Sequence, residues 1–243
     1  MPHTVLGIDL GTSSVKCMLM DADGRVRGAA SCPYPTSRAR TGWAEQNPAD
    51  WCEAVACAVA EIKRSEPALF DAIGAVGLCS AAHIPVLLDH EDDVIRPAIL
   101  WSDQRSEAQV QELNGEHGTL LERVALNRAG CTWTLPQLLW LRAFEPANYA
   151  RVRSVLCSKD FLLWKLTGEK ATDLASAAAT LMADVPSRQW SRTLTGLAAL
   201  PAEALPPIRP ACAEAGRVSP GAALIFGLPA GVPVHVGTLD SAA

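Results

Sequence analysis

A carboxylate followed by a short run of small residues stands near the start of the chain. Asp9 ends an apolar stretch and precedes three small residues and a lysine, namely Gly11, Thr12, Ser13 and Lys16. Small side chains let backbone N–H groups approach an anion closely, and hydroxyls add further donors. A carboxylate before such a turn can hold Mg²⁺ beside phosphates, directly or through water. Neither the Walker motif nor the dinucleotide-binding glycine motif is present, so an ordinary hairpin with a polar turn is the alternative interpretation.

A second carboxylate, Asp240, lies just beyond the strand expected over residues 232–237. Carboxylates at strand ends commonly face a cleft in α/β sheets. Asp240 can therefore act as a general base toward a substrate hydroxyl while Asp9 serves a metal ion. The alternative is a helix N-cap, because a strand followed by Asp-Ser-Ala-Ala is typical of a helix start. Domains rarely end within a crossover, so we expect a fragment of a longer protein or an end near a domain boundary.

A histidine, His83, lies in the otherwise apolar stretch between two expected strands. As a functional residue it would donate a hydrogen bond to a polar substrate from a loop at a strand end. A hydrogen-bonded histidine of the core is the alternative, and a lone His is more often of that kind.

Tryptophans in expected loops are candidates for contact with a sugar, because an indole face packs on the C–H face of a sugar ring. Trp43, Trp101 and Trp133 fall in loops. Asp103 and Arg105 follow Trp101, and their side chains can bind hydroxyls or brace the loop. A buried Trp with a surface ion pair is an equal alternative.

Three strands joined by two tight turns are expected to position Asp9. They cover residues 5–10, 15–20 and 25–31, and Gly24 ends the second turn, where a positive φ costs glycine little. Two tight turns make an antiparallel meander, not a βαβ unit.

Helices and strands alternate after this meander. Asn47 is the expected N-cap of a helix that begins at Pro48 and ends near Arg64. The pattern predicts strands over residues 73–79, 85–88, 152–156 and 232–237, and helices from about 105 to 113, over 135–144 and over 159–166. Residues 197–233 are rich in Ala and Pro and show little periodicity.

Composition excludes several classes of protein. Hydrophobic residues make up 49% of the 243 residues and charged residues 19%, which argues against disorder. The net charge of −5 and the lack of a basic tract argue against a nucleic-acid partner. The uncharged, largely apolar run between Asp71 and Asp89 is shorter than the roughly 20 residues that a spanning helix needs.

The N-terminal sequence predicts the compartment and the state of the cysteines. MPHTVLGIDLG has no basic n-region, so we expect no signal peptide and a cytoplasmic protein. The eight cysteines are then expected to be reduced thiols. No CxxC pair occurs, which favours small buried apolar residues over a disulfide framework or a metal site.

Six segments, taken in order, resemble the FGGY carbohydrate kinases, and most closely the xylulokinases among them. They are VLGIDLGTSSVKCMLMDADGRV, GWAEQNPADW, RPAILWSDQRS, TLPQLLWLR, SKDFLLWKLTGEKATDLASAAAT and VPVHVGTLDSAA. The resemblance implies an α/β fold of the actin-like ATPase (ribonuclease H-like) type, with a mixed five-stranded sheet flanked by helices and with helical insertions. Residues 1–243 would form the N-terminal domain, with the sugar pocket and the first phosphate loop. The C-terminal nucleotide-binding domain would be absent from this chain.

The resemblance also implies roles for single residues. Asp240 matches the Asp that accepts the proton of the sugar hydroxyl, and Asp9 matches the catalytic Asp that organises Mg²⁺. The residues implied to bind ATP phosphates are Gly11, Thr12, Ser13 and Lys16, and those implied to contact the sugar are Ala82, His83, Trp101 and Asp103.

Three departures from the xylulokinase pattern concern the substrate. Those kinases typically read Gln-Met-His-Gly at residues 81–84, where this chain reads Ala-Ala-His-Ile. Ser241 stands where they have Asn, and Gln137 where they have the Lys of a family signature. Losing a Met side chain and an Asn amide would open the pocket and remove hydrogen-bond partners, which can alter sugar preference strongly.

The expected function is ATP-dependent phosphorylation of a primary hydroxyl of a ketopentose such as xylulose, or of a related polyol, with ATP and Mg²⁺ as cofactors. The 243-residue chain alone is expected to be inactive, because half of the ATP site would be missing. Alternatives are a kinase for glycerol, erythritol or ribulose, and a non-catalytic nucleotide switch like actin or the heat-shock ATPases. The expected partner is a small sugar or polyol, not a nucleic acid or a membrane, and a homodimer is left open.

Overall fold

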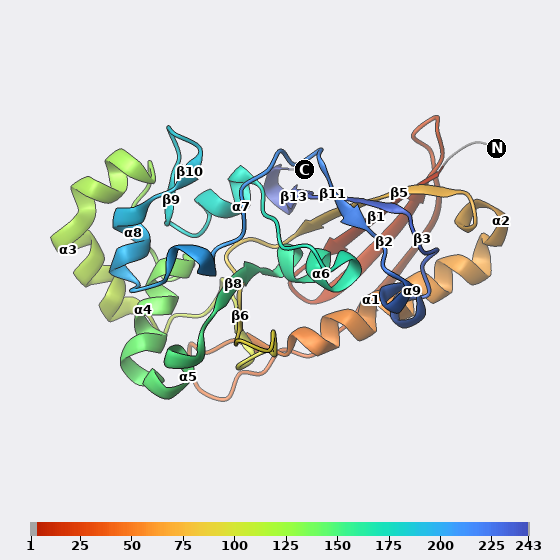
Figure 1. The fold of residues 1–243 in the computed structure, drawn as a ribbon. Helices are drawn as coiled ribbons and strands as arrows, with labels where there is room; N and C mark the ends of the chain where they lie inside the picture. The colour runs from red at the N-terminus through yellow and green to blue at the C-terminus, as the bar shows by residue number, and fades with distance from the viewer. Residues whose placement is uncertain (1–3, 243) are drawn as a thin grey trace.

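The computed structural model describes residues 4–242, and a mixed β-sheet forms its larger half (Figure 1). The sheet contains seven strands, in the order β11 (Glu214–Arg217), β12 (Pro233–His235), β5 (Ile73–Ser80), β1 (Thr4–Leu10), β2 (Ser14–Met20) and β3 (Val26–Pro33), with β13 (Thr238–Leu239) also paired with β5. β1, β12 and β13 run parallel to β5, whereas the other neighbouring strands are antiparallel.

Helices surround this sheet and build the other half of the molecule. The α-helices are α1 (Pro48–Ser65), α2 (Pro67–Phe70), α3 (Glu107–Val124), α4 (Thr134–Phe144), α5 (Pro146–Arg151), α6 (Ser158–Thr167), α7 (Leu174–Ala178), α8 (Arg192–Leu197) and α9 (Pro220–Phe226). Two short 3₁₀ turns are η1 (Ala202–Ala204) and η2 (Asp240–Ala242). Among residues 4–242, no helix is long and apolar enough to cross a lipid bilayer.

The meander predicted for the N-terminus is confirmed. β1, β2 and β3 pair antiparallel in sequence order, and the turn before β3 is closed by hydrogen bonds from the amides of Asp23 and Arg25 to the Asp21 carboxylate. Side chains alternate between the faces of a strand. One face of β1 therefore buries its aliphatic residues, whereas the other carries Asp9.

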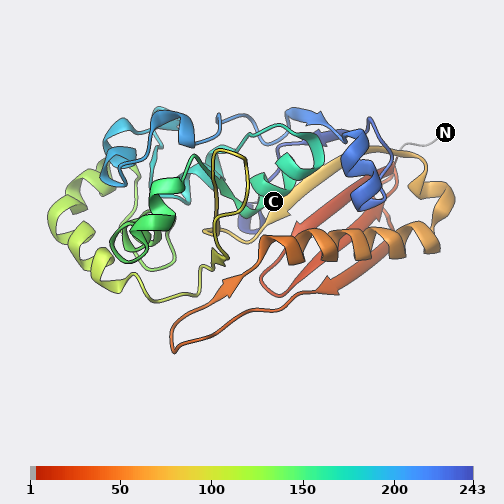
Figure 2. The same ribbon diagram turned by 60° about the horizontal axis from the view of Figure 1, so that its bottom comes forward.

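The first long helix begins and ends where the sequence predicted, within one residue. The Asn47 side chain accepts a hydrogen bond from the Ala49 amide, and Pro48 occupies the first turn, where a missing N–H costs nothing. Lys63 and Arg64 lie in the last turn, where cations favour the helix dipole. Figure 2 shows α1 running across one face of the sheet, where it packs on β2 and β3.

The strand expected over residues 232–237 is broken in two. β12 ends at His235, and β13 resumes pairing with β5 beyond Gly237. Gly237 has φ +73°, and a Cβ there would lie 2.0 Å from the Leu78 carbonyl oxygen of β5. Only glycine allows such an approach of two backbones. This break and the edge strand β11 explain why the sheet has seven strands and not the five expected.

Helical insertions form a second layer with a hydrophobic core of its own. Its buried residues come from α3 and α4 and from the strands and connections around them, and three two-stranded ribbons lie outside the main sheet. The ribbons pair β4 (Glu45–Gln46) with β7 (Ala98–Ile99), β6 (Pro85–Leu88) with β8 (Ser154–Cys157), and β9 (Ala183–Asp184) with β10 (Gln189–Trp190). Figure 1 shows this layer beside the sheet, with the chain end at Asp240–Ala242 between them.

The expectation that all cysteines are free thiols is wrong for one pair. Cys32 of β3 and Cys57 of α1 form a disulfide, with Cα atoms 6.4 Å apart, within the range that a disulfide spans. The two residues are 25 apart in sequence and meet only because α1 packs on β3. The other six cysteines are free, as expected.

This disulfide predicts a measurable contribution to stability. Cys57→Ser should lower the free energy of unfolding by about 3 kcal/mol, since closing a loop of this length restricts the denatured chain by about that amount. Cys57 is exposed, so the substitution leaves no cavity. Urea denaturation without reductant measures the difference, which should vanish when dithiothreitol is added to both proteins. Eight titratable thiols in the oxidised wild type would contradict the disulfide.

Candidate active site

Three strand ends meet at one edge of the main sheet. Asp9 of β1 and Thr238 of β13 both pair with Cys79 of β5, from opposite sides. Because neighbouring strands lie about 4.8 Å apart, the backbones of Asp9 and Thr238 are separated by about 10 Å. Asp240 follows Thr238 by two residues. Ligands of open α/β sheets bind beyond the carboxyl ends of parallel strands, so both predicted carboxylates lie at a binding edge.

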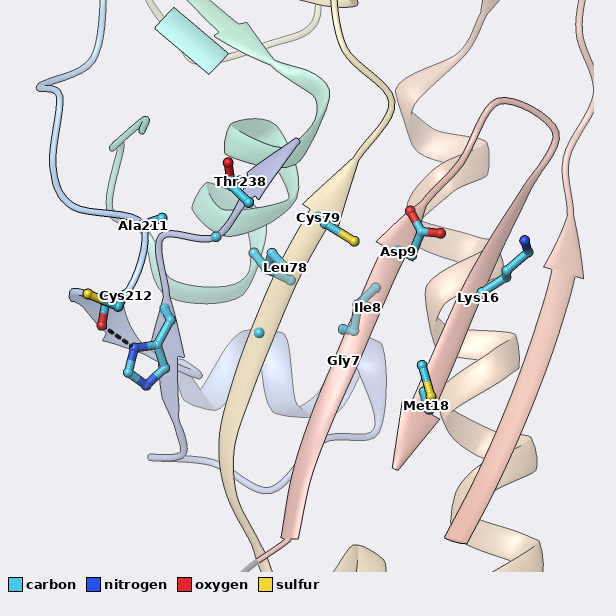
Figure 3. Close-up of a pocket in the computed structure, with 13 residues that line it drawn as sticks. Gly7, Ile8, Asp9, Lys16, Met18, Leu78, Cys79, Ala211, Cys212 and Thr238 are labelled. Carbon is cyan, nitrogen blue, oxygen red and sulfur yellow. Dashed lines mark hydrogen bonds between the residues drawn. The ribbon is translucent and has the colours of Figure 1, made fainter. Parts of the chain in front are cut away.

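The pKa of the Cys79 thiol is affected by both carboxylates. Its pKa is raised to about 12, first by burial and then by the negative charges of Asp9 and Asp240. Strand register places both residues near the end of β5, since Asp9 pairs with Cys79 and Asp240 follows Leu239, which pairs with Ser80. Figure 3 shows Asp9 and Cys79 pointing toward one another. The thiol stays protonated at neutral pH and is no nucleophile.

A cavity of about 470 Å³ opens on the sheet face that carries Asp9 (Figure 3). Gly7 and Gly77 pair in register and contribute no side chain, so the floor is flat between β1 and β5. Lys16, directly opposite Asp9 across β1 and β2, and Thr238 line the same cavity. Asp9 and Lys16, which are close in sequence, therefore lie on the same face of the sheet.

The loop from Gly11 to Ser13 is tied down through its carbonyl oxygens. The Gln46 amide donates to the Thr12 carbonyl at 2.8 Å, and the Tyr34 hydroxyl donates to the Gly11 carbonyl. Within residues 4–242, the amides of Thr12 and Ser13 donate to no acceptor. The loop is thus held from one side and keeps two N–H groups free for an anion.

Asp240 is exposed and begins the turn η2. Its Oδ1 accepts a hydrogen bond from the Ser241 amide at 2.6 Å. An N-cap side chain accepts from the amide two or three residues on, and Asp240 makes no such bond within residues 4–242, so the N-cap alternative is not supported. The second carboxylate oxygen of Asp240 remains available to a ligand.

His83 adopts a left-handed backbone conformation, with φ 61°, between β5 and β6. Its Nδ1 lies 2.7 Å from the Ala179 carbonyl, and its ring meets Trp133 edge to face at 4.6 Å between centroids. The carbonyl can only accept, so Nδ1 carries the proton and Nε2 of the neutral ring is an acceptor. This corrects the expectation of a histidine that donates to the substrate. Ala82 precedes it in the same loop and is half-buried.

The pKa of His83 is lowered, chiefly by burial, with the Ala179 carbonyl and the charge of Asp240 opposing that effect. The unfolded chain therefore takes up this proton at a higher pH than the folded protein does. The contribution of the neutral ring is full above the ordinary histidine pKa of about 6.5 and is lost as pH falls through the lower folded value.

A pH series of urea denaturation tests this sign. Between pH 7.5 and 5.5, wild type should lose more stability than His83→Gln, whose amide does not titrate. His90→Gln, at an exposed histidine, is the control and should behave as wild type. Equal losses in wild type and His83→Gln would show that His83 is not held neutral.

Trp101 lies beside the phosphate-loop candidate. Its indole Nε1 donates to the Thr12 hydroxyl at 3.1 Å, and its side chain is 40% exposed. The alternative of a buried Trp is therefore wrong, and part of the side chain remains accessible.

Asp103 differs from its expected role. The Arg105 guanidinium donates to both of its carboxylate oxygens, at 2.9 and 2.7 Å, and the Ala44 amide donates to it at 2.6 Å. Both charged side chains are 1% exposed. Asp103 thus braces the loop after Trp101 and is not free to bind a substrate. The ion pair is buried, not at the surface.

Some residues of the site were missed by the sequence analysis. Cys79 lies in no motif, whereas Gln46 and Thr238 lie in segments that resemble the family but were not singled out. They enter the site through strand register and through a hydrogen bond between residues 34 apart in sequence. Only a register prediction for β5 against β1 could have found Cys79.

The order and direction of the strands, with helices and helical insertions around them, define an actin-like ATPase fold. The chain belongs to the FGGY family of carbohydrate kinases, since the model of the family's N-terminal domain matches residues 4–243.

Individual relatives agree with this family. A xylulose kinase of Bacillus subtilis (strain 168) is 32% identical over 98% of this chain and 48% of its own length. A xylulose kinase of Escherichia coli (strain K12) is 35% identical, also over 98% and 48%. A glycerol kinase of Thermococcus kodakarensis is 26% identical over 86% of this chain and 43% of its own. The chain spans about half the length of these curated relatives.

A solved structure agrees in three dimensions. The crystal structure of xylulose kinase from Rhodospirillum rubrum superposes with a TM-score of 0.94 at 31% identity, over 98% of this chain and 49% of that one.

Proposed function

We propose that the protein containing these residues is an ATP-dependent kinase that phosphorylates a primary hydroxyl of a ketopentose, such as xylulose. The observation that carries this proposal is the pair of carboxylates at one end of the sheet, Asp9 near the end of β1 and Asp240 directly after β13, where both strands pair with β5. Two carboxylates in separate roles suit phosphoryl transfer, in which one serves the phosphate side and the other the acceptor hydroxyl.

Asp240 is proposed as the general base. It is exposed, and the strand before it, β13, pairs with the end of β5, which leads into the loop of His83. A carboxylate within hydrogen-bond reach of a hydroxyl accepts its proton as the oxygen attacks phosphorus. His83, with Nε2 free to accept, is proposed to hold another hydroxyl of the sugar and so to orient it.

Asp9 and the loop Gly11–Ser13 are proposed to meet the phosphates. Asp9 Oδ1 is buried and has no hydrogen-bond partner within residues 4–242, as expected of a group that serves a ligand. In this part of the chain no three acidic, His or Cys side chains cluster as a metal site. One carboxylate nevertheless fits Mg²⁺, which commonly binds through one or two carboxylates, substrate phosphates and water. When bound, Mg²⁺ neutralises charge on the phosphates.

The Thr12 and Ser13 amides, the Thr12 hydroxyl and the Lys16 ammonium are proposed to hold the phosphate oxygens of ATP. Fixed donors of this kind stabilise developing charge without reorganising in the transition state. The adenosine site is proposed to lie in the half of the relatives that this chain does not span. Residues 1–243 alone should then release no ADP. Because the proposed reaction consumes ATP, we propose that the protein acts in the cytoplasm.

The proposal also concerns which sugar or polyol accepts the phosphate. The xylulose kinases among the relatives support xylulose, whereas the glycerol kinase supports glycerol or another small polyol such as erythritol. Ala82 offers a smaller side chain than the Met of the xylulokinase pattern, which leaves room for a different acceptor.

A screen of phosphate acceptors tests the function. The whole protein that contains these residues should form ADP from MgATP only when a suitable sugar is present, with kcat/KM highest for xylulose or a close relative. ATP hydrolysis that no sugar or polyol stimulates would overturn the proposal and favour a nucleotide switch.

A further inference from the structure

The first turn of α6 holds a buried charged cluster outside the site described above. Lys159 is 0% exposed, and its Nζ lies 2.6 Å from Asp160 Oδ1 and 3.5 Å from Asp173 Oδ1. Burial alone would lower the pKa of Lys159, but the two carboxylates outweigh it and raise that pKa. The ammonium is therefore charged. Buried charges are costly, so such a cluster calls for an explanation.

A third partner of Lys159 belongs to the segment that leads to Asp240. Nζ donates to the Val236 carbonyl at 2.9 Å. Val236 stands immediately before Gly237, at the break between β12 and β13. A charged donor makes a stronger hydrogen bond than a neutral one, so Lys159 fixes the backbone at the break.

Asp173 holds the same segment on the other side of the break. Thr238 Oγ1 donates to Asp173 Oδ2 at 2.8 Å. The same carboxylate caps α7 by accepting from the Ala175 amide at 3.1 Å, which fixes its own orientation. Two buried charged side chains thus hold the residues on both sides of Gly237.

The first turn of α6 also reaches β5. The Ser158 hydroxyl donates to Ser80 Oγ at 3.0 Å, and Ser80 pairs with Leu239 of β13. A single turn of helix therefore holds two neighbouring strand ends, one of which leads directly into Asp240.

We propose that Lys159, Asp173 and Thr238 are positioning residues, which hold the Asp240 carboxylate at the acceptor hydroxyl. This inference rests on the proposed function, because it assumes that Asp240 is the base. Asp240 is exposed and lies in a short turn, so its place is set by the backbone that precedes it. A displacement of about 1 Å at a reacting group can cost about 10²-fold in rate.

Thr238 offers the cleanest test, because replacing Lys159 would leave two carboxylates buried without a cation. Thr238→Val keeps the shape and removes the hydrogen bond to Asp173, whereas Thr238→Ser keeps the hydroxyl. In the whole protein, Thr238→Val should lower kcat at least about 10-fold, with the KM for sugar within about 2-fold, and Thr238→Ser should restore most of kcat. A purely structural role would change the yield of folded protein and not kcat per folded molecule.

Asp240→Asn separates this inference from the proposed function. In that background Thr238→Val should cause no further loss, since a residue that acts through Asp240 has nothing left to position. Full activity of Asp240→Asn would remove the proposed function. An inactive Asp240→Asn beside a Thr238→Val of wild-type kcat, or a further loss in the double variant, would remove the positioning role alone.

Discussion

Asp240→Asn is expected to lower kcat for sugar phosphorylation by about 10²- to 10⁴-fold, the range that a general base contributes. The amide has nearly the shape of the carboxylate and can still accept from the Ser241 amide, which lies 2.6 Å from Asp240 Oδ1. It cannot take up a proton at neutral pH. The fold and the sugar affinity should therefore persist while turnover is lost, which steady-state kinetics and calorimetric titration with sugar together measure.

Asp23→Asn is the matched control for that experiment. Asp23 is an exposed carboxylate in the turn between β2 and β3, far along β2 from the loop at Gly11–Ser13. This variant should keep the kcat of wild type. Near-normal turnover in Asp240→Asn would exclude Asp240 as the base, whatever the control shows.

Gly237→Ala is expected to be the most destabilising single substitution that the fold suggests. A Cβ would lie 2.0 Å from the Leu78 carbonyl oxygen, and φ of +73° is unfavourable for alanine. A left-handed conformation costs about 1–2 kcal/mol and overpacking about 1–3 kcal/mol or more, so the loss should be on the order of 4 kcal/mol. That is a large share of the stability of a typical domain. Urea denaturation measures the loss, and sugar binding should weaken with it, because β13 must leave β5.

Gly24→Ala is the control that measures the cost of the left-handed backbone conformation without a close approach to another strand. Gly24 has φ +74°, but a Cβ there would meet nothing within 4 Å. Its loss should be only about 1–2 kcal/mol, the cost of the left-handed conformation alone. Equal losses at Gly24 and Gly237 would mean that β13 does not need the contact with Leu78.

Elements with strong local signals were predicted well from the sequence. Asn47 and Pro48 mark the start of α1, and Gly168 ends α6 in a left-handed conformation, as expected of a glycine at a helix end. The meander followed from three short strands joined by two tight turns. All of these signals act between residues close in sequence.

Packing between distant segments explains where the sequence misled. The helix that the sequence predicted to end near residue 113 continues to Val124, because Leu121 is buried in the second core. β11 and α9 lie in the Ala- and Pro-rich region that showed no periodicity. The Cys32 disulfide depends on the packing of α1 against β3.

In the candidate site, too, the sequence indicated the residues but not their contacts with distant segments. Residue types pointed to Asp9, His83 and Asp103, but their partners decide what each can do. Arg105 and the Ala44 amide occupy Asp103, and the Ala179 carbonyl fixes the proton of His83. Partners 59 and 96 residues away leave no local pattern from which to predict a role.

The structure of the protein with a bound ketopentose tests the central claim most directly. The account predicts that the primary hydroxyl of the sugar lies about 2.6–3.2 Å from a carboxylate oxygen of Asp240, on the side that faces Asp9. A sugar bound elsewhere, or a hydroxyl turned away from Asp240, would contradict it.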